Sequence, residues 1–221
     1  MFARLRSSRS ANFVVEIAMI VVGISIALWF ESLYEEMQER ETEQQYLQGL
    51  ADDLGNDIKE LDDVINDNEK RLEHFMGIIP GLDELGEASS EEQAQTIFAP
   101  SSYWFFEPAR VTYLSMRESG DFRLLSDPLV KESLLHLMRR YDQIEIRQNN
   151  FLQALDDGYI PLMMANFDMI EQQITNPELL ENPLFRNFFI YAVQDTTSRV
   201  DIMRVSRKEA AELLELVESQ L

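Results

Sequence analysis

The sequence contains no cysteine and only two histidines among its 221 residues. Without cysteine it has no disulfides, no thiol catalysis and no Cys-ligated metal, although the compartment stays open because many exported proteins also lack cysteine. Glycine and proline are sparse, at 8 and 7 residues. The straight-chain residues that replace them lose little side-chain freedom in a helix, so the composition favours helices over sheets.

Positive charge is also scarce, with 19 Lys and Arg against 40 Asp and Glu and a net charge of -21. The few bases are unevenly placed. Arg4, Arg6 and Arg9 against Glu16 leave residues 1–30 at +2, so residues 31–221 carry -23. Such a domain repels nucleic acid and anionic lipid headgroups, and we expect no nucleic acid among its partners.

One apolar stretch, Phe13 to Phe30, is long enough to cross a bilayer. As a helix its 18 residues would measure about 27 Å, close to the hydrocarbon thickness. Trp29, Phe30 and Tyr34 stand at its far end, where an aromatic belt is expected. We therefore predict a transmembrane helix over residues 13–33, with the bilayer as a partner.

The orientation follows from the charges on either side of this stretch. Arg4, Arg6 and Arg9 precede it as interfacial anchors, while Arg40 is the single base in the 13 residues that follow it. By the positive-inside rule residues 1–12 form a basic cytoplasmic tail, and the main domain is periplasmic, outside a bacterial inner membrane. Twelve residues are too few for a cytoplasmic signalling domain of their own.

A cleaved signal peptide is the alternative interpretation of the same stretch. Ser25-Ile26-Ala27 is an acceptable small-x-small cleavage site, but the apolar run continues through Leu28 to Phe30 without a turn, which favours an uncleaved anchor. Gly23 and Ala27 are four residues apart, a small-xxx-small pair that lets two membrane helices approach closely. Glu16, near the edge of the span, is an intramembrane acid of the kind that can be functional.

Beyond the span, helical spacing dominates. From Glu31 to about Ile79 the chain predicts one long helix, with a solvated acidic stalk over residues 34–46 and an extracytoplasmic α-helical domain over residues 47–221. The apolar residues of this helix recur at spacings of three and four. They are Tyr46, Leu47, Leu50, Leu54, Ile58, Leu61, Ile65, Leu72, Phe75 and Ile79.

Start and stop signals divide the rest of the chain. Ser89 with Glu92 forms a capping box for a helix to about Phe98, and Gly120 ends a helix that begins near Ala109. Ser126-Asp127-Pro128 and Asn182-Pro183 each place a capping side chain before a proline, which predicts two further helix starts. The first of these helices should break near Gly158, and Pro161 should begin a short helix to about Ile174. The fold prediction is all-α: a transmembrane helix that continues into a long acidic helix and joins a bundle of four or more helices.

Three motifs support a resemblance. They are Gly23-Ile24-x-Ile26-Ala27-Leu28-x-x-Glu31, then Tyr46-Leu47-x-x-Leu50-x-x-Asp53-Leu54-x-x-Asp57, and Thr112-Tyr113 followed by Ser119-Gly120-x-x-x-Leu124-Leu125. Together they resemble a family of uncharacterised bacterial proteins that have one N-terminal membrane helix and an α-helical domain of unknown function. The residues after the span are acidic here, whereas that family is richer in Lys and Arg there. The resemblance implies no activity, cofactor or catalytic residue.

Candidate sites outside the span are few. Tyr103, Trp104, Phe105 and Phe106 form a possible aromatic contact cluster, which we expect to be an extended plug packed over the helices. A ligand platform and a membrane-dipping tip are the alternatives. Ser133 and His136 lie three residues apart, but no orienting carboxylate or oxyanion hole is signalled. His74 shows no metal spacing. The acids between Asp52 and Asp67 are expected to form a solvated helix face and not a calcium site. Met163 and Met164 suit core filling or a partner surface.

We therefore predict a non-enzymatic, single-pass membrane-anchored protein without cofactors, catalytic residues or metal ligands. It would act as a scaffold or accessory subunit of a membrane complex, with a protein partner or a second copy of itself. The alternative is a periplasmic ligand-sensing bundle that signals through a partner.

Overall fold

The computed structural model describes the backbone of residues 5–221 and the side chains of Phe13 and of residues 15–221. Over this range the protein is helical almost throughout, which confirms the all-α prediction. Its α-helices are α1 (Leu5–Ile78), α2 (Ser90–Phe98), α3 (Val111–Ser119), α4 (Pro128–Ala154), α5 (Ile160–Asn166) and α6 (Pro183–Glu218). Short 3₁₀ segments span Ile79–Glu87, Ala99–Ser101, Asp121–Leu124 and Pro177–Leu179, and a π-helical turn spans Leu155–Tyr159.

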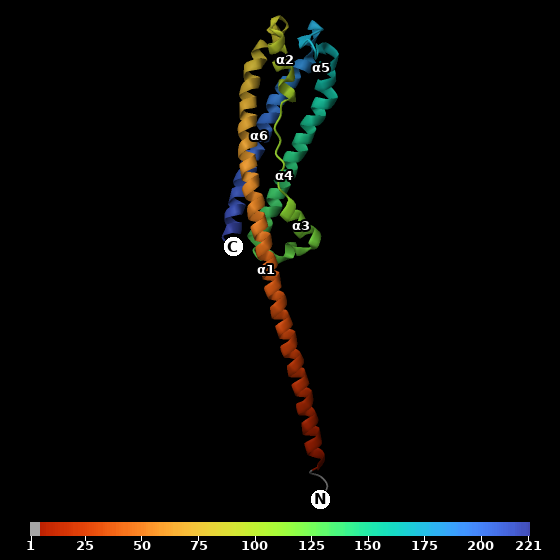
Figure 1. Ribbon diagram of the computed structural model, residues 1–221, viewed down its shortest axis with the longest axis vertical. Helices are drawn as coiled ribbons and strands as arrows, with labels where there is room; N and C mark the ends of the chain where they lie inside the picture. The colour runs from red at the N-terminus through yellow and green to blue at the C-terminus, as the bar shows by residue number, and fades with distance from the viewer. Residues whose placement is uncertain (1–4) are drawn as a thin grey trace.

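The chain passes along the long axis of the molecule four times (Figure 1). It rises through α1, descends through α2, an extended segment and α3, rises again through α4 and α5, and returns through α6. Helix α6 packs against both α1 and α4. The second pass is thus the irregular one, because two short helices and an extended segment stand where a long helix would complete a four-helix bundle.

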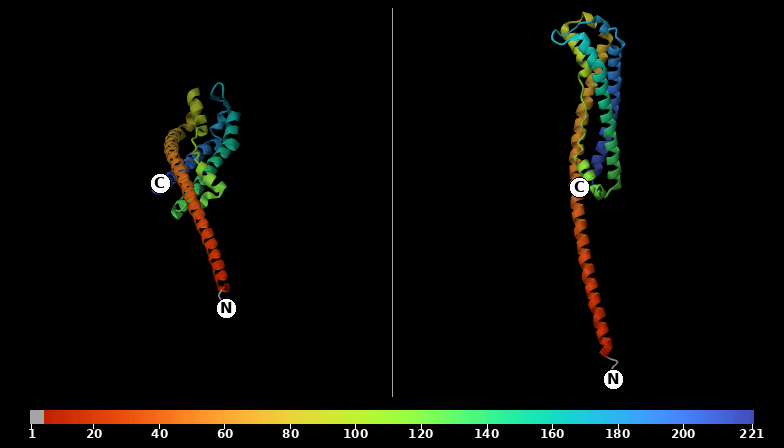
Figure 2. Two further views of the ribbon diagram at one scale, coloured as in Figure 1. Left: turned by 60° about the horizontal axis from the view of Figure 1, so that its bottom comes forward. Right: turned by 90° about the vertical axis from the view of Figure 1, so that its right-hand side faces the viewer.

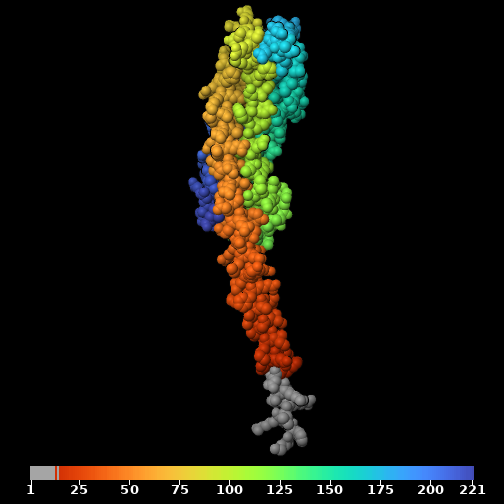
Figure 3. Space-filling view, in the orientation of Figure 1, coloured from red at the N-terminus to blue at the C-terminus, as the bar shows by residue number. Residues whose placement is uncertain are grey.

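Helix α1 runs for 74 residues without a break, as Figure 2 shows from two further sides. Its N-terminal part extends alone below the bundle (Figure 3). Phe13 and residues 15–41 are exposed, and Leu47 is the first buried residue among the side chains described. The apolar stretch at its start is long and apolar enough to cross a membrane, and none of that stretch is buried within the molecule.

The three long helices present one buried seam each, in which successive buried residues alternate between spacings of three and four. This 3.5-residue period is that of coiled coils. The seam of α1 comprises Leu47, Leu50, Leu54, Asp57, Leu61, Val64, Asn68, Arg71 and Phe75. That of α4 comprises Val130, Leu134, Leu137, Tyr141, Ile144, Gln148, Phe151 and then Leu155 beyond its end. That of α6 comprises Phe185, Phe189, Ala192, Thr196, Arg199, Met203, Ser206, Ala210, Leu213 and Val217.

The helix starts follow the local signals. Ser89 and Glu92 form the capping box of α2, with the Ser89 hydroxyl accepting the Glu92 N–H and the Glu92 carboxylate accepting the Ser89 N–H. The side chains of Asp127 and Asn182 cap α4 and α6, each with proline as the next residue. Gly120 ends α3 at φ 80°, a conformation that other residues adopt only at a cost.

The predicted break near Gly158 and the helix from Pro161 to Ile174 are corrected by the structure. The π-helical turn carries α4 into α5 without a break, since a wider turn accommodates a proline that has no N–H to donate. Helix α5 then ends at Asn166, and a hairpin follows in which Phe167 pairs with Ile174. The Asp168 carboxylate accepts the N–H groups of Ile170 and Glu171, a local turn that competes with helix continuation.

The extended segment, residues 102–110, descends between α1 and α4 (Figure 1). Pro108 disfavours helix at the residue before it, and the aromatic run prefers extended backbone. Extended backbone that is not in a sheet leaves its N–H and C=O groups without partners unless side chains supply them. The helices on either side therefore have to carry polar residues where a bundle would normally be apolar.

Those side chains come mainly from α1. Asp57 accepts the Ala109 N–H at 2.7 Å, and Glu60 accepts the Glu107 N–H at 2.9 Å. Just beyond the segment, Asp53 accepts the Thr112 N–H in the first turn of α3 at 3.0 Å. Asn68 donates to the Trp104 carbonyl at 3.0 Å. From the other side, Gln148 of α4 binds both backbone groups of Phe106. The expectation that the acids of residues 52–67 form only a solvated face is thus wrong for Asp53, Asp57 and Glu60.

Candidate functional site

A polar layer divides the interior of the bundle. Below it lies one apolar cluster, from Leu47 to Val64 on α1 with its neighbours, and above it lies a second cluster around Phe75, Tyr159 and Phe189. The polar layer consists of the seam residues Asn68, Arg71, Gln148, Thr196 and Arg199. All five are buried, and Asn68, Thr196 and Arg199 completely so. Buried polar groups cost free energy unless they are partnered, so this layer is the feature of the core that packing alone does not explain.

Two guanidinium groups share this layer with one carboxylate. Arg199 donates from Nε to Asp195 at 2.7 Å, and the Asp195 side chain is 9% exposed. Arg71 donates from Nη1 to the Thr196 hydroxyl at 3.2 Å and from Nη2 to the Pro100 carbonyl at 2.9 Å, both neutral acceptors. Arg71 Nε and Arg199 Nη1 have no partner among the described residues.

Aromatic rings supply further compensation for these charges. The Phe151 ring centroid lies 5.2 Å from Cζ of Arg71 and 5.2 Å from Cζ of Arg199. Arg71 also lies 4.9 Å from the Phe75 ring, and Arg199 lies 5.2 Å from the Phe105 ring. The negative face of an aromatic ring attracts a cation, and the attraction strengthens when water is excluded.

Burial lowers the pKa of Arg71. Desolvation by burial is the main cause, the neighbouring Arg199 lowers the pKa further, Asp195 acts in the opposite direction, and the result is about 9. The side chain is still protonated at neutral pH, so the layer holds two positive charges against one negative charge. A second anion beside Arg71 would balance it.

A cavity of about 520 Å³ opens beside the polar layer, between α1, α2 and the start of the extended segment. Arg71, Lys70 and His74 line it from α1, and Phe98 and Trp104 line it from the opposite elements. Asp67 is the acid among the lining residues, and it is bound by Lys70 at 3.0 Å. The cavity therefore combines basic side chains with aromatic walls, in a chain that is otherwise strongly acidic.

A second polar site lies lower in the bundle, around Asp57. Burial raises the pKa of Asp57 to about 6, although the Ala109 N–H and the Tyr141 hydroxyl lower it and the nearby Asp53 and Glu60 raise it slightly. The Tyr141 hydroxyl and Asp57 Oδ2 do not meet the geometry of a hydrogen bond, and neither has a partner among the described residues. Burial and the Asp57 charge raise the pKa of Tyr141 far above its usual range, so it remains a neutral phenol.

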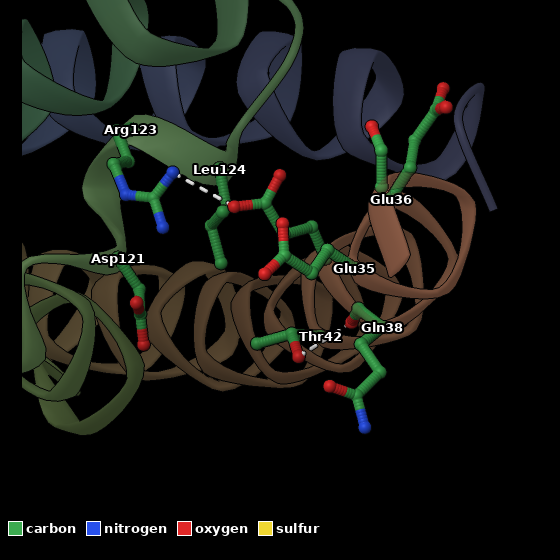
Figure 4. A pocket seen from close by; sticks show the side chains of 9 residues that line it. Glu35, Glu36, Gln38, Thr42, Asp121, Arg123 and Leu124 are labelled. Atoms are coloured by element: carbon green, nitrogen blue, oxygen red, sulfur yellow. Dashed lines mark hydrogen bonds and ion pairs between the residues drawn. The ribbon is translucent and has the colours of Figure 1, made fainter. Parts of the chain in front are cut away.

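A notch of about 700 Å³ lies where α1 enters the bundle (Figure 4). Glu35, Glu36 and Glu39 of α1 line it on one side, and Asp121 and Arg123 line it on the other, from the 3₁₀ segment Asp121–Leu124, here called the base loop. Arg123 binds Glu39 at 2.9 Å, whereas Glu36 binds Arg40 of its own helix. Glu39 is nine residues beyond Phe30, about 13 Å along a helix. The base loop therefore covers one side of the predicted stalk and lies within a few turns of the apolar stretch.

The aromatic residues 103–106 do not act as one unit. Phe106 is buried, stacks edge-on against Tyr141 and fits the expected plug. Phe105 is half-buried and stacks on Tyr103 at 4.6 Å. Trp104, 58% exposed, stands at the cavity instead of in the core.

The predicted membrane residues are all exposed where the structure describes them. Gly23, Ala27, Trp29, Phe30 and Tyr34 lie on the free part of α1, and the Trp29 and Phe30 rings lie edge-on at 5.3 Å. Glu16 is exposed as well. The side chains of Arg4, Arg6 and Arg9 lie outside the described residues. The placement of these residues in a bilayer stays a prediction.

The remaining candidates are placed apart. His136 faces Glu209 at 3.4 Å and shares that carboxylate with Arg140, and no hydrogen bond joins it to Ser133. His74 lines the cavity beside Arg71. Met163 is buried, whereas Met164 is exposed. In the described part of the chain, no group of three or more acidic or histidine side chains is arranged to hold a metal ion.

Sequence reasoning missed the polar layer because it counted apolar residues only. The signal was present in the spacing. On α1 the steps of three and four continue through Asp57, Asn68 and Arg71, and on α6 they continue through Thr196 and Arg199. Polar residues that occur at the same three- and four-residue spacings as the buried apolar residues indicate buried polar contacts.

Comparisons with known proteins give no relative from which a role could be transferred: no family model, no curated protein and no solved structure matches the chain.

Proposed function

We propose that the protein is a single-pass, membrane-anchored scaffold or accessory subunit, with its N-terminus in the cytoplasm and its helical domain outside the bacterial inner membrane. The observation that carries this proposal is the continuity of α1. One unbroken helix supplies both a fully exposed apolar stretch and the first seam of the bundle. An apolar surface on all sides of a helix calls for lipid or a partner to cover it.

The acidic base of the domain supports the same arrangement. Glu35, Glu36 and Glu39 follow directly after the aromatic end of the apolar stretch. By the positive-inside rule, bases hold their side of a span in the cytoplasm, so the arginines before the stretch favour a cytoplasmic N-terminus. The acidic side chains after the stretch do not hold the domain there. No catalytic arrangement is part of the proposal.

The absence of cysteine gives a direct test of membrane placement. Single cysteines at Ser7 and Gln153 would be labelled with a membrane-impermeant maleimide in intact spheroplasts. We expect labelling of the Gln153→Cys protein, and labelling of the Ser7→Cys protein only after lysis. The opposite labelling pattern overturns the orientation. A measured mass that corresponds to a chain starting at Leu28 overturns the uncleaved anchor.

The scaffold role is tested by purification of the full chain from its own membrane in mild detergent. We expect an oligomer or a stoichiometric partner, and a monomer without partners contradicts the proposal. For a homo-oligomer, Gly23→Ile should weaken association, because it widens the small-residue face that Gly23 and Ala27 share. Val21→Ile, which adds bulk on roughly the opposite helix face, is the matched control.

Ligand sensing through a partner is the second candidate, favoured by the cavity beside Arg71. The two roles differ in one measurement. A sensor's association with its partner changes when the cavity is filled, whereas that of a scaffold does not.

A further inference from the structure

We propose that the cavity between α1, α2 and the extended segment binds an organic monocarboxylate with a planar apolar body, held by Arg71 and Lys70 and stacked against Trp104. Such binding is a property of the helical domain itself. It does not depend on membrane placement or on the scaffold role.

Arg71 lines the cavity and has no charged partner. A guanidinium has five N–H donors in a planar fork that fits a carboxylate. Arg71 is 7% exposed and binds only a hydroxyl and a carbonyl, while its Nε has no partner among the described residues. Two carboxylates are nearby, and both are bound to other cations: Asp195 by Arg199 and Asp67 by Lys70. A buried charge without a counter-charge is costly, and Arg71 lines a cavity large enough to admit one.

The α1 wall of the cavity carries an excess of positive charge. Residues 31–221 carry an excess of acids, yet the α1 wall of this cavity presents Lys70, Arg71 and His74 against Asp67. Lys70 is exposed and holds Asp67 at 3.0 Å, so its ammonium can turn to a ligand without any change in the core. The basic wall attracts an anion and discriminates against a cation.

The wall opposite α1 is aromatic. Trp104 and Phe98 line it, and Trp104 is exposed although Phe105 and Phe106, which follow it, pack inward. An exposed indole beside a guanidinium offers a stacking surface next to a charge anchor. Pockets of this kind fix a ligand by a few placed polar groups and gain most of their affinity from the apolar walls. In a ligand with a ring and one carboxylate, the carboxylate would bind the basic wall and the ring would stack on the aromatic wall. Inorganic phosphate could bind only the basic wall.

The test uses the full chain in detergent micelles with Trp29→Phe, which leaves Trp104 as the only tryptophan. Emission of Trp104 would be followed during titration with benzoate, with benzamide as the neutral analogue and with inorganic phosphate. We expect saturable quenching by benzoate, with a dissociation constant on the order of 1 mM for so small a probe, and none by benzamide. Equal responses to benzoate and benzamide, or saturation by phosphate alone, overturn the proposal.

Variants connect the signal to the cavity. Lys70→Gln should raise the dissociation constant for benzoate roughly three- to tenfold, since one exposed charge contact is lost. Lys208→Gln, an exposed lysine of α6 away from the cavity, should leave it unchanged. Arg71→Gln should abolish binding, and its fold would be checked by circular dichroism. Because Lys70 is exposed, its variant decides the matter even where Arg71→Gln fails to fold: equal affinities in the Lys70 and Lys208 variants contradict the site.

Discussion

The side-chain amide of Gln148 makes two hydrogen bonds to the main chain of Phe106. Gln148 Oε1 accepts the Phe106 N–H at 2.9 Å, and Nε2 donates to the Phe106 carbonyl at 3.1 Å. The pair reproduces with a side chain what a neighbouring strand would provide in a sheet. It fixes the middle of the extended segment against α4 and lets the bundle accept a pass that is not helical.

Loss of this pair should destabilise the domain severely. Gln148→Leu keeps the approximate shape but leaves two buried main-chain groups without partners, each costing about 1–3 kcal/mol. We expect the free energy of unfolding to fall by about 2–5 kcal/mol, with a lower Tm in thermal circular dichroism of the full chain. Gln153→Leu, at an exposed position of the same helix, is the control. A similar Tm for both variants would show that the two hydrogen bonds contribute little.

Two glycines of α1 should respond to alanine in opposite directions. A Cβ on Gly49 would lie 2.8 Å from Oγ1 and 3.1 Å from Cγ2 of Thr112, whereas a Cβ on Gly55 meets nothing within 4 Å. We expect Gly49→Ala to cost about 1–3 kcal/mol through overpacking. Gly55→Ala should add about 0.5–1 kcal/mol, because alanine loses less backbone entropy in a helix.

The contact with Thr112 can be isolated by a double-mutant cycle. If the clash is the cause, Thr112→Ala should restore most of the stability lost in Gly49→Ala. Denaturant unfolding of the four proteins at one pH measures the coupling. Additive effects would mean that Gly49 is needed for another reason.

Asp57 should make the domain lose stability as the pH rises. Burial raises its pKa from 3.8 to about 6 in the folded state, so between these values the folded form binds more protons than the unfolded form. The stabilisation is complete below about pH 4 and is lost as the pH rises through 6. At about 1.4 kcal/mol per pKa unit, the contribution lost is about 1–3 kcal/mol.

Asp57→Asn removes this titration and keeps an oxygen that can accept the Ala109 N–H. Its stability relative to the natural protein should therefore improve between pH 4 and pH 7.5 by about the same 1–3 kcal/mol. Denaturant unfolding at three pH values measures this difference. Asp63→Asn, on the exposed face of α1, is the control. A pH-independent difference between Asp57→Asn and the natural protein would place the proton elsewhere.

Asp195 is the one carboxylate bound within the polar layer, and its neutralisation should be costly. Asp195→Asn leaves two buried guanidinium groups without a formal counter-charge, for which we expect a loss of about 3–5 kcal/mol. Asp201→Asn breaks an exposed contact with Arg204 at 3.6 Å and should change stability by less than about 1 kcal/mol. Thermal unfolding of both variants gives the comparison, and equal shifts would contradict the importance of charge balance in the layer.

The sequence predicted those parts of the fold that depend on near neighbours. The caps at Ser89, Asp127 and Asn182 and the left-handed Gly120 are local matters of one or two hydrogen bonds or one dihedral angle, and the structure confirms each. The end of α5 at Asn166 was missed, because the Asp168 turn competes with a pattern that also suits a helix.

The polar layer could not be predicted in the same way, because its partners are far apart in the chain. Arg71 meets Thr196 across 125 positions, and Asp57 meets Ala109 across 52. Only the folded bundle shows that the extended segment needs these side chains. Spacing marks their positions as buried, but it does not say which main-chain groups they satisfy.

Because α1 is continuous, it fixes the rotation of the bundle relative to the apolar stretch. Each residue of a helix turns it by about 100° and lengthens it by about 1.5 Å, so one residue inserted between Phe30 and Glu39 would rotate the bundle by that angle relative to the apolar stretch. A deletion of seven residues would nearly restore the original azimuth and shorten the helix by about 10 Å. The length of this short linker therefore sets which face of the bundle points toward any neighbour bound along the apolar stretch.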